Sequence, residues 1–483
     1  MKREFFLNIL FLVSINLLIK PFYIFGIDRT VQNVVGIDAY GLYFILFNFT
    51  FLLQIINDFG IQIFNSRKIA QNPELIAKYF PGIMLLKLFL GGLFFATVFI
   101  AAHFNYNQPS YYPFLWWIGL IHVLNSLILY LRSNIAGLGW YRTDSIISSL
   151  NKLLMIIICG VLLWTANFRD DFRIEWFIYA QVATLLITAL IAGWIIRKKV
   201  SWQRWKIDRS FILQIIKDSY PYALVIFLMT VYTRVDVVMI ELLLSDGIPQ
   251  AGVYASAYRL LDASNMIGFL FAGLLLPMFA KMLKTGESFR ELLRFSFQLI
   301  MAGSITVSIG VYFFQEEIMF LLYDEATSDW GPVLGYLMLS FIPVCAIYIY
   351  STLLTANENL MQMNRLFVLG IVMNIVLNYF LIQSHKAAGA ALTTALTQSF
   401  IALGLIVLAM KNFNLIWDNA LIAKIVGFTI GVIILFYSST HLNDVDWTVK
   451  FLGSIILSIL LAFLFRLIHL RSFMELLETK VKK

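Results

Sequence analysis

Apolar runs long enough to cross a bilayer recur along the whole chain, and short polar stretches separate them. A membrane-spanning helix needs roughly 20 consecutive apolar residues. The separating stretches are polar or contain Pro and Gly, as at Asn105–Ser110 and Ser245–Gln250. The pattern predicts about fourteen helices. We expect them at residues 4–26, 40–66, 79–103, 112–138, 143–165, 174–196, 216–244, 251–280, 293–314, 331–354, 364–383, 388–410, 419–440 and 448–470.

The first apolar run, Phe5–Ile19, follows Lys2 and Arg3 and could pass for a secretory signal peptide. A signal peptide ends at a small-residue cleavage site. Here the run is followed instead by Lys20 and Pro21. We therefore interpret it as a retained first helix.

The composition excludes a soluble protein. Hydrophobic residues make up 60% of the chain and charged residues only 13%, whereas about 25% of the residues of a soluble protein are charged. Cys159 and Cys345 both fall inside apolar runs, so neither a disulfide framework nor a metal site is indicated. We expect an all-α polytopic membrane protein.

The net charge of +8 could suggest a nucleic-acid partner, but the positions of the basic residues indicate membrane topology instead. With the N-terminus in the cytoplasm, the inner loops hold 24 of the 36 Lys and Arg residues and the spans hold seven. Cytoplasmic loops are enriched in Lys and Arg. We therefore expect both termini on the cytoplasmic side of an inner membrane. The outer loops hold five basic residues, Arg29, Arg169, Arg173, Lys386 and Lys450.

The spans divide into two groups of six with two more behind them. We expect an N-terminal lobe at residues 1–196, a basic cytoplasmic linker at 197–215, a C-terminal lobe at 216–410, two further helices within 411–470 and a basic cytoplasmic tail at 471–483. The linker and the tail are expected to rest on anionic membrane lipids of the inner leaflet.

A short similarity relates the two lobes. The second span opens on Tyr40-Gly41-Leu42-Tyr43, and the eighth opens on Ala251-Gly252-Val253-Tyr254. Six-span halves keep the same orientation, so the pattern favours a parallel repeat about an axis along the membrane normal. In transporters built from such repeats, substrates bind between the halves.

The charged residues inside the spans have a positive excess. A charge in hydrocarbon costs about 3 kcal/mol or more, so it usually faces a cavity or a partner. The acidic residues in the spans are Asp58, Asp236, Asp262 and, at an end, Glu241. This excess fits an anionic ligand better than a cationic one. The basic residues in the spans are Lys20, Lys87, Arg132, Lys152, Arg234, Arg259 and Arg466.

Four of these charges share one level in the outer half of the membrane. They are Arg234 and Asp236 on the seventh span and Arg259 and Asp262 on the eighth. Asp236 could pair with Arg259, which would leave Arg234 for a ligand. Alternatively, the four residues form a structural network that ties the two spans together. Three tyrosines share the region and are candidate cavity aromatics: Tyr232, Tyr254 and Tyr258.

The remaining charges differ in depth. Lys152 lies near the middle of the fifth span, and we expect it to face a cavity. Lys20, near the end of the first span, could face the same cavity or extend to the interface. Asp58 lies in the inner half of the second span and could act as a gate or pair with Lys87.

Signals for enzyme chemistry are poor. His122 stands alone in a span, which is more typical of a packing residue than of a ligand. Asp444 and Asp446 form a D-x-D pair of the kind that can hold a metal in sugar transferases, but such a short match is common. No outer loop exceeds about 16 residues, and no Gly-Lys phosphate-binding loop is present. We expect no catalytic residue, no metal and no cofactor, and so no enzyme.

Several short motifs resemble those of bacterial lipid-linked oligosaccharide flippases, the Wzx-type transporters of O-antigen and capsule. In the first half they are Gly26–Asn33, Tyr40–Tyr43 and Asn57–Ile61. In the second half they are Arg234–Asp236, Gly252–Tyr254 and Tyr258–Leu260. The resemblance extends over most of the chain through the number and grouping of the spans.

This resemblance implies the fold of the multidrug/oligosaccharidyl-lipid/polysaccharide (MOP) exporters, shared with MATE exporters and the lipid II flippase. It implies an undecaprenyl-diphosphate-linked glycan as cargo, for lipopolysaccharide O-antigen or another surface polysaccharide. It also implies a cationic central cavity, to which Arg29, Arg234 and Arg259 are carried over. A polysaccharide polymerase and assembly proteins would be partners, and H+ or Na+ could drive transport.

Three other functions remain open. A cation-coupled exporter of small molecules on the same fold would use Asp58, Asp236 and Asp262 for coupling. A membrane glycan polymerase or lipid-dependent glycosyltransferase is disfavoured by the short outer loops. A scaffold in a polysaccharide machine is disfavoured by the charges inside the spans.

Overall fold

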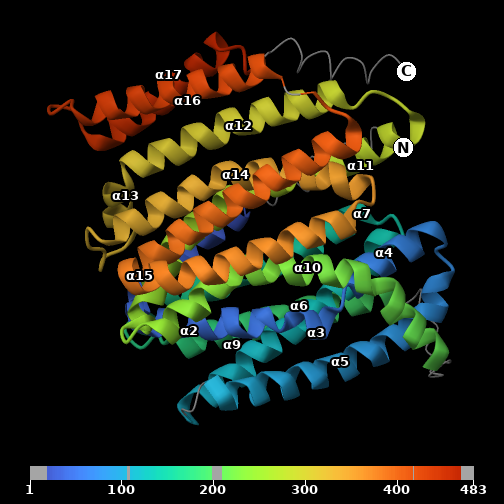
Figure 1. Ribbon diagram of the computed structural model, residues 1–483. Helices are drawn as coiled ribbons and strands as arrows, with labels where there is room; N and C mark the ends of the chain where they lie inside the picture. The colour runs from blue at the N-terminus through green and yellow to red at the C-terminus, as the bar shows by residue number, and fades with distance from the viewer. Residues whose placement is uncertain (1–18, 106–108, 198–208, 417, 469–483) are drawn as a thin grey trace. The chain divides into compact units, whose positions relative to one another are not determined.

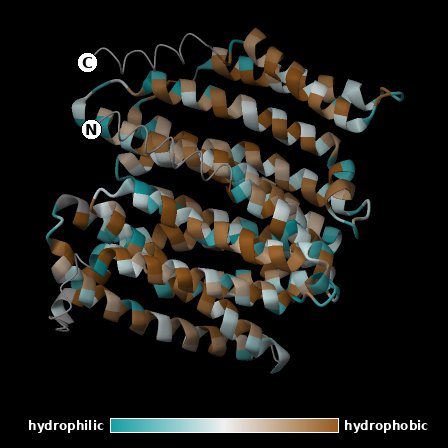
Figure 2. Cartoon of the chain, turned by 180° about the vertical axis from the view of Figure 1, so that it is seen from behind, coloured by the Kyte–Doolittle hydropathy of each residue, from teal (hydrophilic) through white to brown (hydrophobic). Residues whose placement is uncertain are grey.

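A computed structural model describes residues 19–105, 109–197, 209–416 and 418–468. Over these ranges the regular structure is helical, and twelve helices are long and apolar enough to cross a membrane. Hydrophobic residues cover the sides of the helices, and hydrophilic residues gather toward their ends (Figure 2). The expected all-α polytopic membrane fold is confirmed.

Contacts group the chain into two units, Met1–Ala255 and Ser256–Lys483. In the first unit, α6 packs against α4, α9, α2, α5 and α7, and α10 packs against α2 and α4 (Figure 1). The elements of this unit are η1 (Tyr23–Asp28), α2 (Arg29–Leu52), α3 (Gln54–Asp58), α4 (Ile61–Gln71), α5 (Leu75–Asn105), η2 (Pro109–Tyr111), α6 (Tyr112–Gly137), α7 (Tyr141–Trp164), α8 (Ala166–Arg169), α9 (Ile174–Ile196), α10 (Arg209–Leu243) and the first turns of α11 (Gly247–Thr285).

In the second unit, α14 packs against α12, α13 and α15, while α16 and α17 pack against each other and against α12. The last two helices match the spans predicted at 419–440 and 448–470, and their grouping as a pair behind two groups of six stays a prediction. The elements are the remainder of α11, then α12 (Arg290–Phe313), α13 (Gln315–Leu322), α14 (Trp330–Ala356), α15 (Leu360–Phe413), α16 (Asn419–Thr440) and α17 (Trp447–Leu464).

Most predicted spans match observed helices. The spans predicted at 174–196 and 419–440 coincide with α9 and α16. The pair predicted at 364–383 and 388–410 forms the two arms of α15, which meet at Lys386, a residue with non-helical backbone angles. The first predicted span, 4–26, lies largely outside the described residues.

Three boundaries were predicted wrongly. The outer loop expected at 27–39 is helical, with a break only at Gly36 (φ 82°). The span expected at 40–66 is interrupted after Asp58, where Phe59 (φ 51°) and Gly60 (φ 69°) are left-handed. The helix expected from residue 216 begins at Arg209, because its first turns pack: Ile215 is buried in the apolar core of the first unit.

The division of the chain at the linker stays a prediction. Residues 198–208 of the linker lie outside the described ranges, as does the tail. By contacts, α10 belongs with the first unit, as do the first turns of α11.

The two glycines of the sequence repeat meet where α2 and α11 cross. A Cβ on Gly41 would lie 2.3 Å from the carbonyl oxygen of Ile248 and 3.0 Å from the amide nitrogen of Gly252. A Cβ on Gly252 would lie 2.5 Å from the carbonyl oxygen of Ile37. Gln32 secures the crossing by donating from Nε2 to the Gly252 carbonyl oxygen at 3.2 Å. Small residues allow this close approach of membrane helices.

Replacing Gly41 or Gly252 with Ala should therefore push the two helices apart. We expect a loss of about 1–3 kcal/mol in stability, the usual cost of overpacking. Thermal unfolding of the detergent-solubilised protein measures the effect. Gly92→Ala is the matched control, because a Cβ there meets nothing within 4 Å. Equal unfolding temperatures for all three variants would contradict the close crossing.

Candidate functional site

A cavity of about 170 Å³, lined by both polar and apolar side chains, lies in the first unit. One water takes up about 30 Å³ in the liquid, so the cavity has room for roughly six waters. Aromatic rings, amides and one ammonium group line it together with apolar side chains. The lining residues are Phe47, Phe51, Ile121, His122, Asn125, Asn151, Lys152, Met155, Gln181, Thr184 and Leu185.

Helical spacing brings these side chains to one place. Residues three or four apart lie on the same face of a helix. Accordingly α2 presents Phe47 and Phe51 to the cavity, and α6 presents His122 and Asn125. A third helix, α9, contributes Gln181 and Thr184 in the same way, and α7 adds Asn151 and Lys152. Polar side chains from three apolar helices, α6, α7 and α9, therefore converge on the cavity.

His122 forms a fixed part of the wall. Its side chain is buried, with Nε2 2.9 Å from Thr50 Oγ1 and 3.3 Å from the Phe47 carbonyl oxygen. The ring centroid of Phe47 lies 4.7 Å from that of His122. These contacts agree with its interpretation as a packing residue with satisfied hydrogen bonds.

Gln181 is also held in place. Its Nε2 donates to the hydroxyl of Tyr43 at 3.0 Å, and both side chains are buried. The hydrogen bond joins α9 to α2 across the wall of the cavity. The amide is therefore positioned before any ligand arrives, which reduces the entropy cost of binding.

One predicted cation, Lys152, lines the cavity, whereas Arg234 lies near one of the lining residues, Phe51. The Lys152 Nζ is 3.8 Å from the centroid of the Tyr23 ring. The Arg234 guanidinium carbon is 5.4 Å from the centroid of the Phe51 ring, and Phe51 itself lines the cavity. Cations at these distances from aromatic faces are attracted by the ring electrons. Lys152 thus brings positive charge to the cavity, and Arg234 stays a predicted cavity cation.

Two buried aspartates in the same unit accept hydrogen bonds from tyrosines. Tyr40 donates to Asp28 Oδ1 at 3.0 Å, and Tyr254 donates to Asp236 Oδ2 at 3.1 Å. Tyr40 precedes Gly41, whereas Tyr254 follows Gly252 by two residues and corresponds to Tyr43 in the repeat, so the two pairs occupy different positions of the two halves. Tyr254 and Asp236 therefore contribute to the joining of α10 and α11. The predicted pairing of Asp236 with Arg259 stays a prediction.

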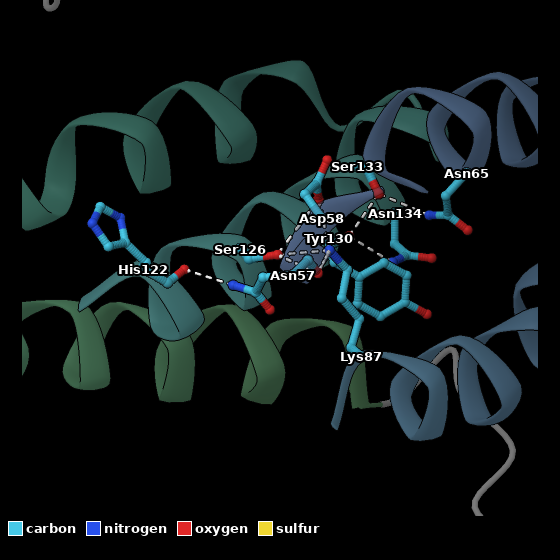
Figure 3. A network of polar contacts seen from close by, with 9 residues as sticks. All are labelled: Asn57, Asp58, Asn65, Lys87, His122, Ser126, Tyr130, Ser133 and Asn134. Carbon is cyan, nitrogen blue, oxygen red and sulfur yellow. Dashed lines mark hydrogen bonds and ion pairs between the residues drawn. The ribbon is translucent and has the colours of Figure 1, made fainter. Parts of the chain in front are cut away.

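Asp58 pairs with Lys87, one of the two roles expected for it (Figure 3). The Lys87 Nζ lies 2.6 Å from Asp58 Oδ1 and 2.7 Å from Ser126 Oγ. The side chains of Lys87 and Asp58 are only 4% and 10% exposed. Removing one partner of such a buried pair costs about 3–5 kcal/mol, because it leaves the other charge uncompensated.

The other predicted residues lie apart from the cavity lining. Lys20 and Arg29 are half-buried in the first unit, and Tyr232 is buried there. In the second unit, Arg259 Nη1 and Asp262 Oδ2 are 3.8 Å apart, one turn along α11. Tyr258 is buried in that unit.

Three amides of the cavity were not predicted from the sequence: Asn125, Asn151 and Gln181. The available signal was the spacing of polar residues within apolar spans, such as His122 with Asn125. The ion pair of Arg132 with Asp144, whose two hydrogen bonds measure 2.7 and 3.1 Å, was not predicted either. That pair joins α6 to α7.

Within the described ranges, no three His, Cys, Asp or Glu side chains lie close enough to hold a metal ion. Asp446, half of the D-x-D pair, caps the start of α17 by accepting from the Thr448 amide at 2.8 Å. The Thr448 hydroxyl donates to the same carboxylate, and these bonds lower the pKa of Asp446. Asp446, one of the two aspartates of the D-x-D pair, thus has a structural role as the N-cap of α17.

The fold and the cavity define a class of protein: a multi-pass membrane protein with the fold of the MOP superfamily. The structure of the lipid II flippase MurJ in an inward closed conformation is similar with a TM-score of 0.66, at 15% identity over 98% of this chain and 99% of that one. An inward-facing multidrug resistance MATE transporter is similar with a TM-score of 0.64, at 13% identity over 83% of this chain and 98% of that one. A MOP-superfamily transporter from Pyrococcus furiosus, described as having a binding pocket of reverse polarity, gives a TM-score of 0.62, at 14% identity over 84% and 95%.

Residues 7–283, more than half of the chain, match the family of polysaccharide biosynthesis proteins. The chain belongs to this family. No curated protein matches it by sequence.

The capping role of Asp446 can be separated from a catalytic one. Asp446→Asn keeps a side-chain oxygen that can accept from the Thr448 amide, and Asp444→Ala removes the other carboxylate. We expect the double variant to make surface glycan at the wild-type level, measured by glycan blots of a deletion strain that carries it. A loss of tenfold or more at normal protein level would instead support a metal-dependent transferase.

Proposed function

We propose that this protein moves an undecaprenyl-diphosphate-linked oligosaccharide from the cytoplasmic to the periplasmic leaflet of the bacterial inner membrane by alternating access. The transported lipid would supply the synthesis of a surface polysaccharide, such as O-antigen. The observation that carries the proposal is the cavity beside Lys152, which offers amides, aromatic faces and positive charge among membrane-spanning helices.

The cargo's chemistry explains why such a cavity is needed. A diphosphate and its sugars cannot enter hydrocarbon without losing their hydrogen bonds to water, whereas the polyprenyl tail can remain in the lipid. Arg is suited to phosphate by its planar fork of donors, and Lys binds phosphate as a point charge. In this proposal Arg234 and Lys152 bind the diphosphate, and Asn125, Asn151 and Gln181 bind sugar hydroxyls.

The size of the cavity limits what it would hold. At about 170 Å³ it is smaller than the 300–1,000 Å³ of typical ligand pockets. It would therefore accept one part of the head group, the diphosphate or the first sugar, while the remaining sugars lie elsewhere along the passage. Arg29 and Arg259 are proposed to serve such further positions, with Lys20.

Family membership supports the polysaccharide part of the proposal, and the likeness to the lipid II flippase supports transport of a lipid-linked cargo. The distribution of basic residues supports cytoplasmic termini. A polymerase that consumes the translocated lipid would be the expected partner.

Deletion of the gene tests the proposal directly. The lipid-linked glycan should still be made, but it should remain in the cytoplasmic leaflet and surface glycan should disappear. Accessibility of the glycan to a periplasmic label in spheroplasts distinguishes the two leaflets. Full surface glycan in a strain without a redundant flippase would contradict the proposal.

Removing charge at the cavity should impair transport more than folding. We expect Lys152→Met and Arg234→Ala each to lower surface glycan at least tenfold, the effect of losing about 1.4 kcal/mol of binding, while membrane levels of the protein stay near normal. Lys152→Arg should retain part of the activity because it keeps the charge. The control is Lys284→Met, which removes an exposed charge. Loss of the protein from the membrane would favour a structural role for these cations.

The fold likeness to a multidrug MATE transporter keeps one other function in view, the export of small molecules. It would appear in the same deletion strain as increased drug sensitivity with normal surface glycan.

A further inference from the structure

The Lys87–Asp58 pair lies at a break in a membrane helix. Asp58 ends α3, and the left-handed residues Phe59 and Gly60 stop the helix there. A helix end leaves carbonyl oxygens without partners inside the helix. In transporters with broken helices, such carbonyls and helix C-terminal ends coordinate Na+ or accept H+. The break therefore creates a place where a cation is stabilised.

The Lys87 ammonium occupies that place. It contacts three oxygens of three kinds: Asp58 Oδ1 at 2.6 Å, Ser126 Oγ at 2.7 Å and the Asn57 carbonyl oxygen at 3.3 Å. The oxygens come from α3 and α6, while Lys87 reaches them from α5 (Figure 3). The ammonium is almost fully shielded, since the side chain is 4% exposed.

The residues that supply these oxygens also have contacts that do not involve Lys87. Asn57 donates from Nδ2 to the His122 carbonyl oxygen at 3.1 Å, which fixes α3 against α6. The Ser126 hydroxyl oxygen lies 3.4 Å from the Asn57 carbonyl oxygen and 3.5 Å from Asp58 Oδ1. The group is thus positioned by the packing of the two helices as well as by the cation.

We propose that this group of oxygens is a site for a monovalent alkali cation such as Na+, and that the Lys87 ammonium fills it permanently. Carboxylate, hydroxyl and carbonyl oxygens are the ligands that hard cations take in proteins. The site contains one carboxylate, so one positive charge balances it, whereas a divalent ion would leave a buried excess charge.

A tethered cation has a specific consequence for energy coupling. An ion that drives transport must leave its site on one side of the membrane and be replaced from the other. Lys87 cannot dissociate from the chain, so this site takes up no Na+ in the native protein. Asp58 is then a fixed part of the structure, and its charge is balanced throughout a transport cycle.

Removal of the Lys87 side chain tests the proposal. Lys87→Ala empties the space that the chain and its ammonium fill, and it leaves the carboxylate available to an ion. Thermal unfolding of the purified protein is compared in NaCl and in choline chloride at equal ionic strength. We expect the Lys87→Ala protein to unfold at least about 3 °C higher in NaCl, because a ligand that binds only the folded state stabilises it. The wild type should unfold at the same temperature in both salts.

Two further variants identify the oxygens as the cause. Lys87→Met fills the same space with a neutral chain of similar length, so it should be destabilised equally in both salts. Lys87→Ala combined with Asp58→Asn lacks the carboxylate and should lose the sodium response. If the Lys87→Ala protein cannot be purified, Lys87→Ser offers the same space with an added hydroxyl.

The proposal is overturned if folded Lys87→Ala or Lys87→Ser protein unfolds at the same temperature in both salts, or if the wild type itself is stabilised by Na+. The measurement requires neither glycan nor transport. Its outcome is therefore independent of the proposed flippase function.

Discussion

A polar group within the hydrocarbon of a membrane must find its partner inside the protein, since no water is available there. This requirement governs the first unit. Lys87 is neutralised by Asp58, and the buried carboxylates of Asp28 and Asp236 each accept from a tyrosine. Each of these contacts joins two different helical segments. The polar residues therefore determine which helix faces can meet, whereas the apolar residues determine only that the helices lie in the membrane.

The cavity differs from the rest of the unit, because some of its polar groups face open space that a ligand could fill. Its aromatic and amide groups are held by neighbours, as Gln181 is by Tyr43, yet they border open space. Preorganised polar groups around a space among apolar helices suit a ligand that carries charge and hydroxyls. The same unit thus contains two lysines within membrane-spanning helices in different settings: Lys87 is buried and enclosed by protein oxygens, whereas the half-buried Lys152 lines the cavity.

Features that depend on a single segment could be predicted from the sequence, whereas features that depend on the packing of several helices could not. Hydrophobic runs located most helices, because crossing the membrane is a property of a single segment. The break at Phe59 was missed, although Asn57, Asp58 and Gly60 interrupt the apolar pattern there, because the long predicted span was continued across them. The amides of the cavity were missed because their convergence depends on how α6, α7 and α9 rotate against one another. Asp58 lay between these cases: its need for a partner was evident, but the choice of Lys87 depended on packing.

The crossing of α2 and α11 joins main chain to main chain through Gly41 and Gly252. At the two glycines themselves there is no side chain whose rotamer must be fixed when the helices meet, so these positions add no side-chain entropy cost to the contact. The fit of the two helices therefore depends on backbone shape at these two positions, and any side chain added at either glycine would prevent it.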